Sequence, residues 1–566
     1  MNSFNLELQK LFQEKNYEEI IKKIESSVEK NKISSGLLNI LGVSRVLSFK
    51  KDISILELAL ENFKESYLKE KNTQISLDAL TNYVNLFVQI FDMKNDEISS
   101  KNLEQEFHNT LIMVKEAEEN FGYNHKFFLS IVKLYKKLNN ISKCIFYLQK
   151  IFENNNGDKN TLCSYIYYNS FQNNWSQKDF LSNSKEINAY CVDLDQHKLT
   201  RLCKKKNNKI KLGFLSSDIY KKHSVTYFLK TVIANYDNDK FEIYLYNNNK
   251  DEDLSTKEFQ NLVNKSYNIF NLSDLDAVNH IRNDNIDIAF DLMGLTSSNR
   301  INLFKNRIAP IQISWLGYCN TTGLHEIDYI VSDHNLIKEN EIDLYSEKII
   351  FLPNIWSCHV GFELSRTETQ PPCIKKDHVT FGSFNNFNKI NENVIKTWSN
   401  IIKEVNKSKL VLKSSVNINI YNLKKVFKEY GVLDSVIFLN KQTSFENHLK
   451  LYENVDIALD TFPYNGVTTS FEAIWMGVPV LTMEGFNFNS RCGESINKNI
   501  HMNDLVAKSE EDYISKAISL ANDKKKLLGV RKKIFNDSLL SPLFNQKNFC
   551  FNFFKSIDKI YREKIY

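Results

Sequence analysis

The chain has 566 residues, more than one hydrophobic core usually supports, so its length predicts about two to four domains. Apolar residues make up 42% and charged residues 25%, which is ordinary globular usage and excludes a wholly disordered, collagen-like or coiled-coil chain. The 73 basic and 68 acidic side chains leave a net charge of +5, too small to indicate a protein that binds nucleic acid by neutralising phosphates.

The cysteines and the apolar runs indicate the cellular compartment in which the protein is expected. Nine cysteines are scattered along the chain and none is spaced C-x-x-C, so we expect neither structural zinc nor a disulfide framework. The first residues, MNSFNLELQKLFQEK, lack the basic-then-apolar pattern of a signal peptide, and no apolar run approaches the roughly 20 residues of a membrane span. We therefore expect a cytoplasmic protein with reduced thiols.

Residues 1–200 are predicted to form an all-helical domain, because every proline lies at or beyond Pro310 and only four of the sixteen glycines come earlier than residue 200. Some positions match the packing residues of a helical-hairpin repeat of about 34 residues. They are Leu41, Gly42, Ala59 and Phe63, and then Tyr135, Cys144, Leu148 and Ile151. The pattern resembles degenerate tetratricopeptide repeats; an irregular all-helical domain is the alternative.

From residue 209, short apolar runs of strand length alternate with stretches of helical period. The first series comprises Ile210–Leu215, Phe241–Tyr246, Ile286–Leu292, Ile311–Gly317, Tyr329–Asp333 and Lys348–Leu352. The second comprises Val379–Phe384, Lys409–Ser415, Val436–Leu439, Val455–Asp460 and Pro479–Met483. This alternation predicts parallel sheets covered by helices on both faces, and the two series predict two doubly wound α/β domains, 209–365 and 376–566.

The polar segment Gly361–Asp377 separates the two series. Its Pro371-Pro372 pair can continue neither a helix nor a central strand, so we interpret the segment as the interdomain linker. Open α/β sheets bind ligands at the carboxyl ends of their strands. Two such domains that face each other therefore predict an active site between them.

The segment Val455–Gly485 carries the most informative chemistry. An apolar strand ends at Asp460, a Pro-Tyr-Asn-Gly turn follows, and Thr468 and Thr469 open a helix that carries Glu472. This order places free N–H groups, hydroxyls and the positive end of a helix dipole at the carboxyl edge of the strand. A diphosphate would bind there; a plain N-cap role for either threonine is the alternative.

The stretch LDTFPYNGVTTSFEAIWMGVPVLT resembles the nucleotide-binding signature of the O-GlcNAc transferase and SPINDLY family of glycosyltransferases, glycosyltransferase family 41. Four other segments resemble further landmarks of that family in the same order: Arg307–Asp333, Phe381–Ile390, Ser490–Ile496 and Ser541–Phe544. The resemblance covers residues 209–563 and implies a GT-B fold, in which two Rossmann-like domains face a cleft, here preceded by the helical region. It also implies inverting transfer without a metal, with the nucleotide sugar held mainly by the second domain.

The resemblance assigns roles to residues of the second domain. The family lysine that matches Lys389 contacts the diphosphate, so Lys389 is expected to stabilise the leaving group. Asn385 and Asn386 are expected to offer amides to the nucleotide or sugar, with turn formation as the alternative. His448 matches a histidine beside the base and ribose. With Thr468, Thr469 and Glu472, these side chains form the predicted nucleotide-sugar site.

His223 matches a family histidine on the acceptor side of the cleft. It is the candidate catalytic base, because an imidazole can take a proton from a hydroxyl. The phosphate of the substrate is the alternative base. No metal is expected, since no strand ends in a convincing D-x-D site, and the spacings Asp251-Glu-Asp253 and Asp274-Leu-Asp276 lie in polar, loop-like or helical sequence. Val467 and Leu295 replace residues common in relatives, but neither change removes Lys389. We therefore expect an active enzyme.

The leading hypothesis is sugar transfer from UDP-GlcNAc to Ser or Thr hydroxyls of a protein or peptide that the helical region recruits. A GDP-fucose donor is the rival, because SPINDLY-type relatives share nearly all these motifs. A third hypothesis is an interaction scaffold with a vestigial GT-B domain. No cofactor, nucleic-acid partner or membrane span is expected in any of these.

Overall fold

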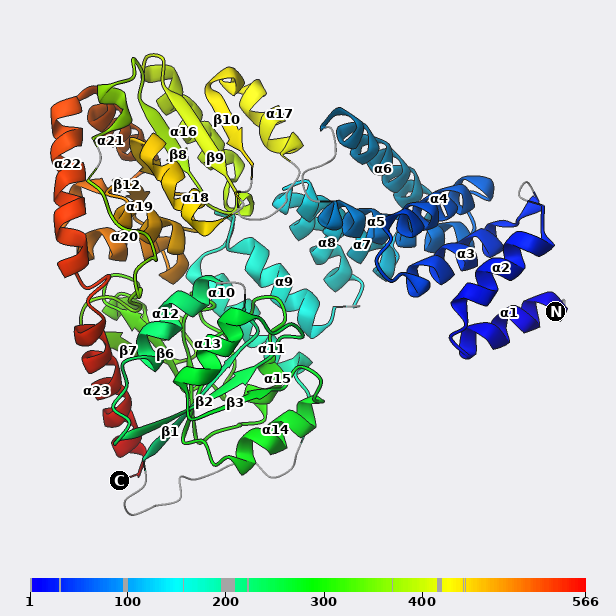
Figure 1. Ribbon diagram of the computed structural model, residues 1–566, viewed down its shortest axis with the longest axis horizontal. Helices are drawn as coiled ribbons and strands as arrows, with labels where there is room; N and C mark the ends of the chain where they lie inside the picture. The colour runs from blue at the N-terminus through cyan, green and yellow to red at the C-terminus, as the bar shows by residue number, and fades with distance from the viewer. Residues whose placement is uncertain are drawn as a thin grey trace. The chain divides into compact units, whose positions relative to one another are not determined.

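The computed structural model (Figure 1) describes residues 3–29, 32–94, 100–155, 157–194, 209–220, 223–368, 370–414, 420–440, 442 and 444–565. The chain divides into two compact units, residues 1–157 with 417–425 and residues 158–416 with 426–566. The predicted domain ranges 1–200, 209–365 and 376–566 stay predictions, and the boundary at residue 200 lies outside the described residues. Ser415, the last residue of the predicted strand Lys409–Ser415, also lies outside the described residues.

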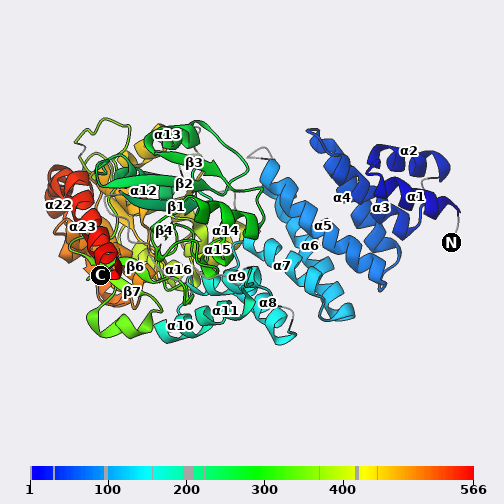
Figure 2. The ribbon, with the colours of Figure 1, turned by 90° about the horizontal axis from the view of Figure 1, so that it is seen from below.

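The first unit is helical, as predicted (Figure 2). Its helices are α1 (Ser3–Gln13), α2 (Tyr17–Ser27), α3 (Ser35–Ser48), α4 (Ile53–Lys69), α5 (Gln74–Met93), α6 (Ser100–Phe121), α7 (His125–Lys137) and α8 (Ile141–Glu153). At Gly42 a Cβ atom would lie 2.6 Å from the ring of Phe63, so the missing side chain lets α3 and α4 approach closely. Cys144, Leu148 and Ile151 of α8 are buried. These positions are therefore packing residues, as the repeat pattern predicted.

The second unit begins with α9 (Lys159–Asn169), α10 (Gln177–Lys185) and α11 (Ile187–Tyr190). A parallel sheet in the order β3-β2-β1-β4-β5-β6-β7 follows. Its strands are β1 (Ile210–Ser216), β2 (Phe241–Asn247), β3 (Lys265–Asn268), β4 (Ile288–Asp291), β5 (Ile311–Ser314), β6 (Tyr329–Asp333) and β7 (Lys348–Leu352). Its helices are α12 (Ser224–Ile233), α13 (Leu254–Leu262), α14 (Asp274–Asn283) and α15 (Ile301–Lys305). All six predicted strands are confirmed, and β3 is an addition.

The second sheet is also parallel and has the order β10-β9-β8-β11-β12-β13. Its strands are β8 (Thr380–Ser383), β9 (Lys409–Lys413), β10 (Val436–Leu439), β11 (Ile457–Leu459), β12 (Val480–Met483) and β13 (Val506–Ala507). The α-helices in this part of the sequence are α16 (Glu392–Glu404), α17 (Tyr421–Glu429), α18 (Phe445–Lys450), α19 (Thr468–Trp475), α20 (Phe488–Asn499), α21 (Glu510–Asn522), α22 (Lys524–Asp537) and α23 (Gln546–Ile565). Short 3₁₀ helices are η2 (Glu339–Leu344), η3 (Pro372–Ile374), η4 (Phe387–Lys389), η5 (Leu433–Ser435), η6 (Leu451–Asn454), η7 (Asn503–Leu505) and η8 (Ser538–Leu540). The second doubly wound prediction is confirmed.

The strand order of each sheet identifies where a ligand would bind. In the first sheet β1 lies between β2 and β4, and in the second sheet β8 lies between β9 and β11. The winding direction reverses at these two places, and open α/β sheets bind ligands at the carboxyl ends of the strands that flank such a reversal. A ligand-binding site is therefore expected at the loops after β8 and β11.

Two segments tie the sheets together within this unit. The linker is anchored by Arg366, whose Nε and one terminal nitrogen donate to the carbonyl oxygens of Trp475 and Phe535, each at 2.8 Å. The last helix, α23, returns to the first sheet, where it lies beside β7 (Figure 2) and its Phe553 packs 4.9 Å from the ring of Trp315. Among the described residues, no helix has the length and apolarity of a membrane span.

Candidate active site

Lys389 ends the short helix η4 that follows β8. Its Nζ donates to the carbonyl oxygen of Asn465 at 2.8 Å and lies 4.5 Å from the ring centroid of Tyr464, a cation–π distance. Burial lowers the pKa of Lys389 from its ordinary value, and the nearby carboxylate of Asp460 opposes that shift. The ammonium is therefore held at the carboxyl edge of the sheet in an enclosed setting.

Asp460, directly after β11, organises the loop that faces Lys389. One carboxylate oxygen accepts from the N–H groups of Thr461 at 2.9 Å and Gly466 at 2.7 Å, and the other accepts from the hydroxyl of Thr482 at 2.8 Å. Burial raises the pKa of Asp460 to about 6, although these hydrogen bonds and the lysine favour the charged form. The Pro-Tyr-Asn-Gly turn is thus folded around a buried carboxyl group.

The helix α19 begins at Thr468, and its N-cap is Val467, which makes no side-chain cap. The N-cap reading of Thr468 and Thr469 is therefore wrong, because both lie inside the first turn. Their backbone N–H groups have no acceptor within the helix, and the positive end of the helix dipole lies there. The hydroxyl of Thr469 donates to the side-chain oxygen of Asn385 at 2.9 Å, which joins α19 to the loop after β8.

A pocket opens between these two loops. Gly466 is needed there because a Cβ atom would lie 2.5 Å from the Thr469 hydroxyl and 2.8 Å from the Asn385 oxygen. Asn386 caps η4 by accepting from the N–H of Asn388 at 3.0 Å, so it has the turn-forming role foreseen as its alternative. The pocket is lined by Gly382, Ser383, Phe384, Asn385, Tyr452, Ala458, Leu459, Asp460, Thr469, Ser470 and Val480.

Glu472 and His448 are in direct contact. One oxygen of Glu472, which is 4% exposed, lies 2.9 Å from Nε2 of His448 and accepts from the hydroxyl of Tyr452 at 3.0 Å. The ring of Phe384 packs against those of Tyr452 and His448, at 4.5 and 5.8 Å. Glu472 thus holds two aromatic side chains in place beside the pocket, and nucleotide contacts by Glu472 and His448 stay predictions.

His223 lies on the first sheet's side and is the N-cap of α12, where its Nδ1 accepts from the N–H of Val225 at 3.4 Å. The imidazole is 43% exposed and its Nδ1 is 3.9 Å from Asp218, whose pKa is raised by burial. Tyr227, one turn along α12, stacks on Phe445 of α18 at 5.8 Å. The helix of His223 therefore packs against the helix of His448, and a catalytic role for His223 stays a prediction.

Sequence reasoning missed the residues that surround Lys389. Tyr464 packs against Phe171, two residues after the end of α9, at 5.1 Å. The side-chain amide of Asn391 donates to the carbonyl oxygens of Phe171 and Phe462, both at 2.9 Å. The Pro-Tyr-Asn-Gly turn was the only local signal for this cluster, because Phe171 lies almost 300 residues earlier in the chain.

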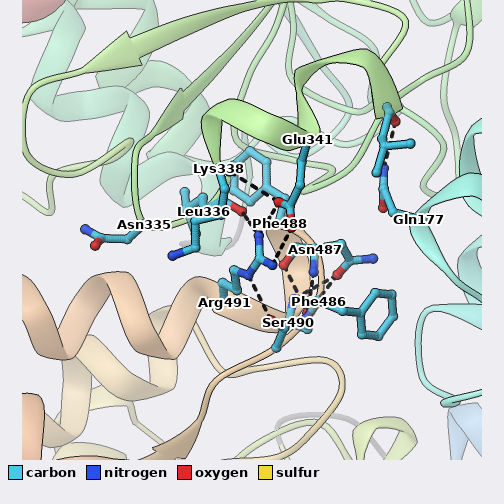
Figure 3. A network of polar contacts seen from close by, with 12 residues as sticks. Gln177, Asn335, Leu336, Lys338, Glu341, Phe486, Asn487, Phe488, Ser490 and Arg491 are labelled. Carbon is cyan, nitrogen blue, oxygen red and sulfur yellow. Dashed lines mark hydrogen bonds and ion pairs between the residues drawn. The ribbon is translucent and has the colours of Figure 1, made fainter. Parts of the chain in front are cut away.

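A polar network joins α20 to the carboxyl edge of the first sheet (Figure 3). Arg491 points from α20 toward Glu341 and donates to both of its carboxylate oxygens, at 2.5 and 2.8 Å, and to the carbonyl oxygen of Leu336 at 3.2 Å. Beside it, the hydroxyl of Ser495 donates to the buried carboxylate of Asp333, the last residue of β6, at 2.7 Å. The segment Ser490–Ile496 thus fastens the two halves of this unit together.

The D-x-D aspartates have other partners. Asp253 caps α13 by accepting from the N–H of Thr256 at 3.0 Å, and Asp274 pairs with Arg300 at 2.7 Å. Within the part of the chain that the structure describes, no group of three or more His, Cys, Asp or Glu side chains is arranged to hold a metal ion.

Both the sequence and the fold are similar to those of known proteins. The profile of the family described as Glycosyl transferase family 41 matches residues 188–364 and 359–553. A tomato (Solanum lycopersicum) protein named "Probable UDP-N-acetylglucosamine--peptide N-acetylglucosaminyltransferase SPINDLY" is 32% identical over 367 residues, which cover 62% of this chain and 38% of that protein. An Arabidopsis thaliana relative with the same enzyme description, named SEC, is 27% identical over 366 residues, which cover 62% of this chain and 37% of that protein.

The fold is similar to that of a solved O-GlcNAc transferase mutant from Thermobaculum terrenum. The TM-score is 0.78 at 21% identity, and the match covers 95% of this chain and 99% of that one. The GT-B prediction, with a helical region before the two sheets, is confirmed. The chain spans less than two fifths of the curated relatives it matches. Because the family profile covers more than half of its residues, this protein belongs to glycosyltransferase family 41.

Proposed function

We propose that the protein transfers a sugar from a nucleotide donor to a protein hydroxyl by an inverting reaction that needs no metal ion. The observation that carries this proposal is the position of the Lys389 ammonium, after β8 and next to the turn that leads into α19. The first turn of α19 lines the pocket through Thr469 and Ser470, and the Lys389 ammonium is held by the turn that leads into that helix, so two sources of positive potential lie in neighbouring segments.

In the proposed reaction the bond between the anomeric carbon and the diphosphate oxygen breaks, and the nucleoside diphosphate leaves with the electron pair. Lys389 and the N–H groups of Thr468 and Thr469 would stabilise the negative charge that grows on it. Charge that appears in the transition state is stabilised strongly by groups already in position, and one such contact typically contributes about 3–4 kcal/mol. This is the role that a divalent cation has in other transferases.

On the other side of the anomeric carbon, the acceptor hydroxyl attacks and loses its proton to a base. We propose His223 for that role. Its imidazole is partly exposed, lies at the start of α12 beside Asp218, and is on the first sheet's side of the unit. Attack from the face opposite to the leaving diphosphate gives inversion.

UDP-GlcNAc is the proposed donor and Ser or Thr hydroxyls are the proposed acceptors, in keeping with the enzyme names that the SPINDLY and SEC relatives carry. The helical region would recruit the polypeptide. GDP-fucose is the second candidate donor, because the contacts proposed for Lys389, Thr468 and Thr469 are to the diphosphate, which both donors share, and not to the base. A cytoplasmic location belongs to the same proposal.

The experiment uses the full chain with three donors: UDP-GlcNAc, UDP-glucose and GDP-fucose. Calorimetry measures the affinity of each, and mass spectrometry of host proteins from cells with and without the chain searches for added hexosamine, hexose or deoxyhexose. A hexosamine on Ser or Thr supports the first donor and a deoxyhexose the second. Saturable binding of none of the three, together with no added sugar, would leave only an interaction scaffold.

A further inference from the structure

The Lys389 ammonium is held by one residue pair of the turn after β11. The ring face of Tyr464 lies 4.5 Å from Nζ, and the carbonyl oxygen of Asn465 accepts its hydrogen bond at 2.8 Å. A lysine side chain has several rotatable bonds and no preferred end point, so its position is set by the groups that contact its ammonium. Those groups belong to Tyr464 and Asn465.

The side chain of Asn465 fixes this turn from behind. Its Oδ1 accepts from the N–H of Gly493 in α20 at 3.0 Å, and its Nδ2 donates to the carbonyl oxygen of Thr461 at 2.8 Å. Its backbone N–H donates to the carbonyl oxygen of Asn489 at 3.2 Å. Asn465 is 0% exposed, so its amide does not reach a ligand and acts only through the backbone that it holds.

The surroundings make this arrangement rigid. Asn391, two residues after Lys389, donates to the carbonyl oxygen of Phe462 in the same turn and to that of Phe171, just after α9. Phe171 in turn packs on Tyr464 at 5.1 Å. The lysine, the turn, the segment after α9 and α20 are therefore linked by hydrogen bonds of buried or half-buried amides, whose loss is costly because their partners would remain unsatisfied.

We propose that Asn465 is a positioning residue for the leaving-group lysine: its buried amide fixes the turn whose carbonyl oxygen holds the Lys389 ammonium at the place where a diphosphate takes over the hydrogen bond. This rests on the proposed function and adds a residue to it.

Three variants test the proposal. Asn465→Asp keeps the size of the side chain but introduces a carboxyl group into the turn that holds the lysine, and Asn465→Ser removes both amide hydrogen bonds. Asn497→Ser is the matched control: Asn497 is also buried, in α20, and donates to the carbonyl oxygen of Val480 at 2.8 Å, without contact to Lys389. Thermal unfolding of each variant confirms that it is folded at the assay temperature.

The first readout needs no activity. The pH dependence of Lys389 acetylation by acetic anhydride, followed by mass spectrometry, gives the pKa of Lys389 in the ligand-free protein. The charged or titratable groups that face the lysine are Tyr464 in the turn, Asp460 after β11, Cys492 of α20 and Cys319 after β5. Asn465→Asp adds a further anion and should raise the pKa of Lys389 by about one unit. Equal titration of Lys389 in the wild type and in Asn465→Asp would overturn the proposal.

The second readout is the split between turnover and binding. Asn465→Ser should lower kcat for sugar transfer by about tenfold or more, since a misplaced charge loses much of its effect on the transition state, while the affinity for UDP changes less than threefold. Asn497→Ser should leave kcat within twofold. Equal kcat losses in both variants would overturn the proposal. A wild-type protein that binds neither UDP nor GDP would instead refute the proposed function, and the acetylation readout would still decide the role of Asn465.

Discussion

Replacing Lys389 by Met removes the ammonium but keeps a flexible side chain of similar length. A charge about 3 Å from a phosphate oxygen contributes roughly 5 kcal/mol at an effective dielectric constant of about 20. Part of this attraction already acts on the bound donor, so the share specific to the transition state is about 3–4 kcal/mol. We therefore expect Lys389→Met to lower kcat by about 10²–10³-fold.

The assay measures transfer to host protein under donor saturation and the affinity for UDP by calorimetry. The affinity should fall far less than kcat, by about tenfold, because the N–H groups of α19 remain. Lys389→Arg is the control, since it keeps the charge with a different shape, and it should retain more activity than Lys389→Met. A Met variant with wild-type kcat, or one whose loss lies entirely in donor affinity, would refute leaving-group stabilisation by Lys389.

Three further results are expected. Because the Asp460 carboxylate favours the charged form of Lys389, Asp460→Asn should lower the pKa of that lysine. The alkaline limb of the pH–kcat profile should then move to lower pH. An alkaline limb at the wild-type pH would contradict the coupling between Asp460 and Lys389. Gly466→Ala should weaken UDP binding at least tenfold, because the new Cβ would lie 2.5 Å from the Thr469 hydroxyl. In the control Gly529→Ala the new Cβ meets no atom within 4 Å, so UDP binding should be unchanged and α22 should be stabilised by up to about 1 kcal/mol. Comparable UDP affinities in the two variants would argue against UDP binding at this pocket. Transfer should persist in EDTA, and its complete loss there, restored by magnesium, would refute a metal-free reaction.

The strands could be predicted because each one forms a continuous apolar run, as both faces of a parallel sheet require. Two strands escaped prediction. β3 (Lys265–Asn268) reads KSYN and is half exposed, and β13 (Val506–Ala507) has two residues. Neither has an apolar run, since these edge strands are held mainly by pairing with a neighbour.

The candidate site could be predicted only where its residues sit in local motifs. Thr468 and Thr469 follow a strand and a turn, and the structure places both in the first turn of α19. The bonds of Asn465 and Arg491 join segments that are far apart in the sequence, and no local pattern indicates such partners. The packing of Phe171 against Tyr464 was missed for the same reason.

A crystal structure of the full chain with UDP tests the central claim most directly. The account predicts that Nζ of Lys389 leaves the carbonyl oxygen of Asn465 and lies about 2.8 Å from a β-phosphate oxygen. The same diphosphate should accept from the N–H groups of Thr468 and Thr469. A diphosphate bound elsewhere, or a Lys389 ammonium that stays on Asn465 with UDP present, would contradict it.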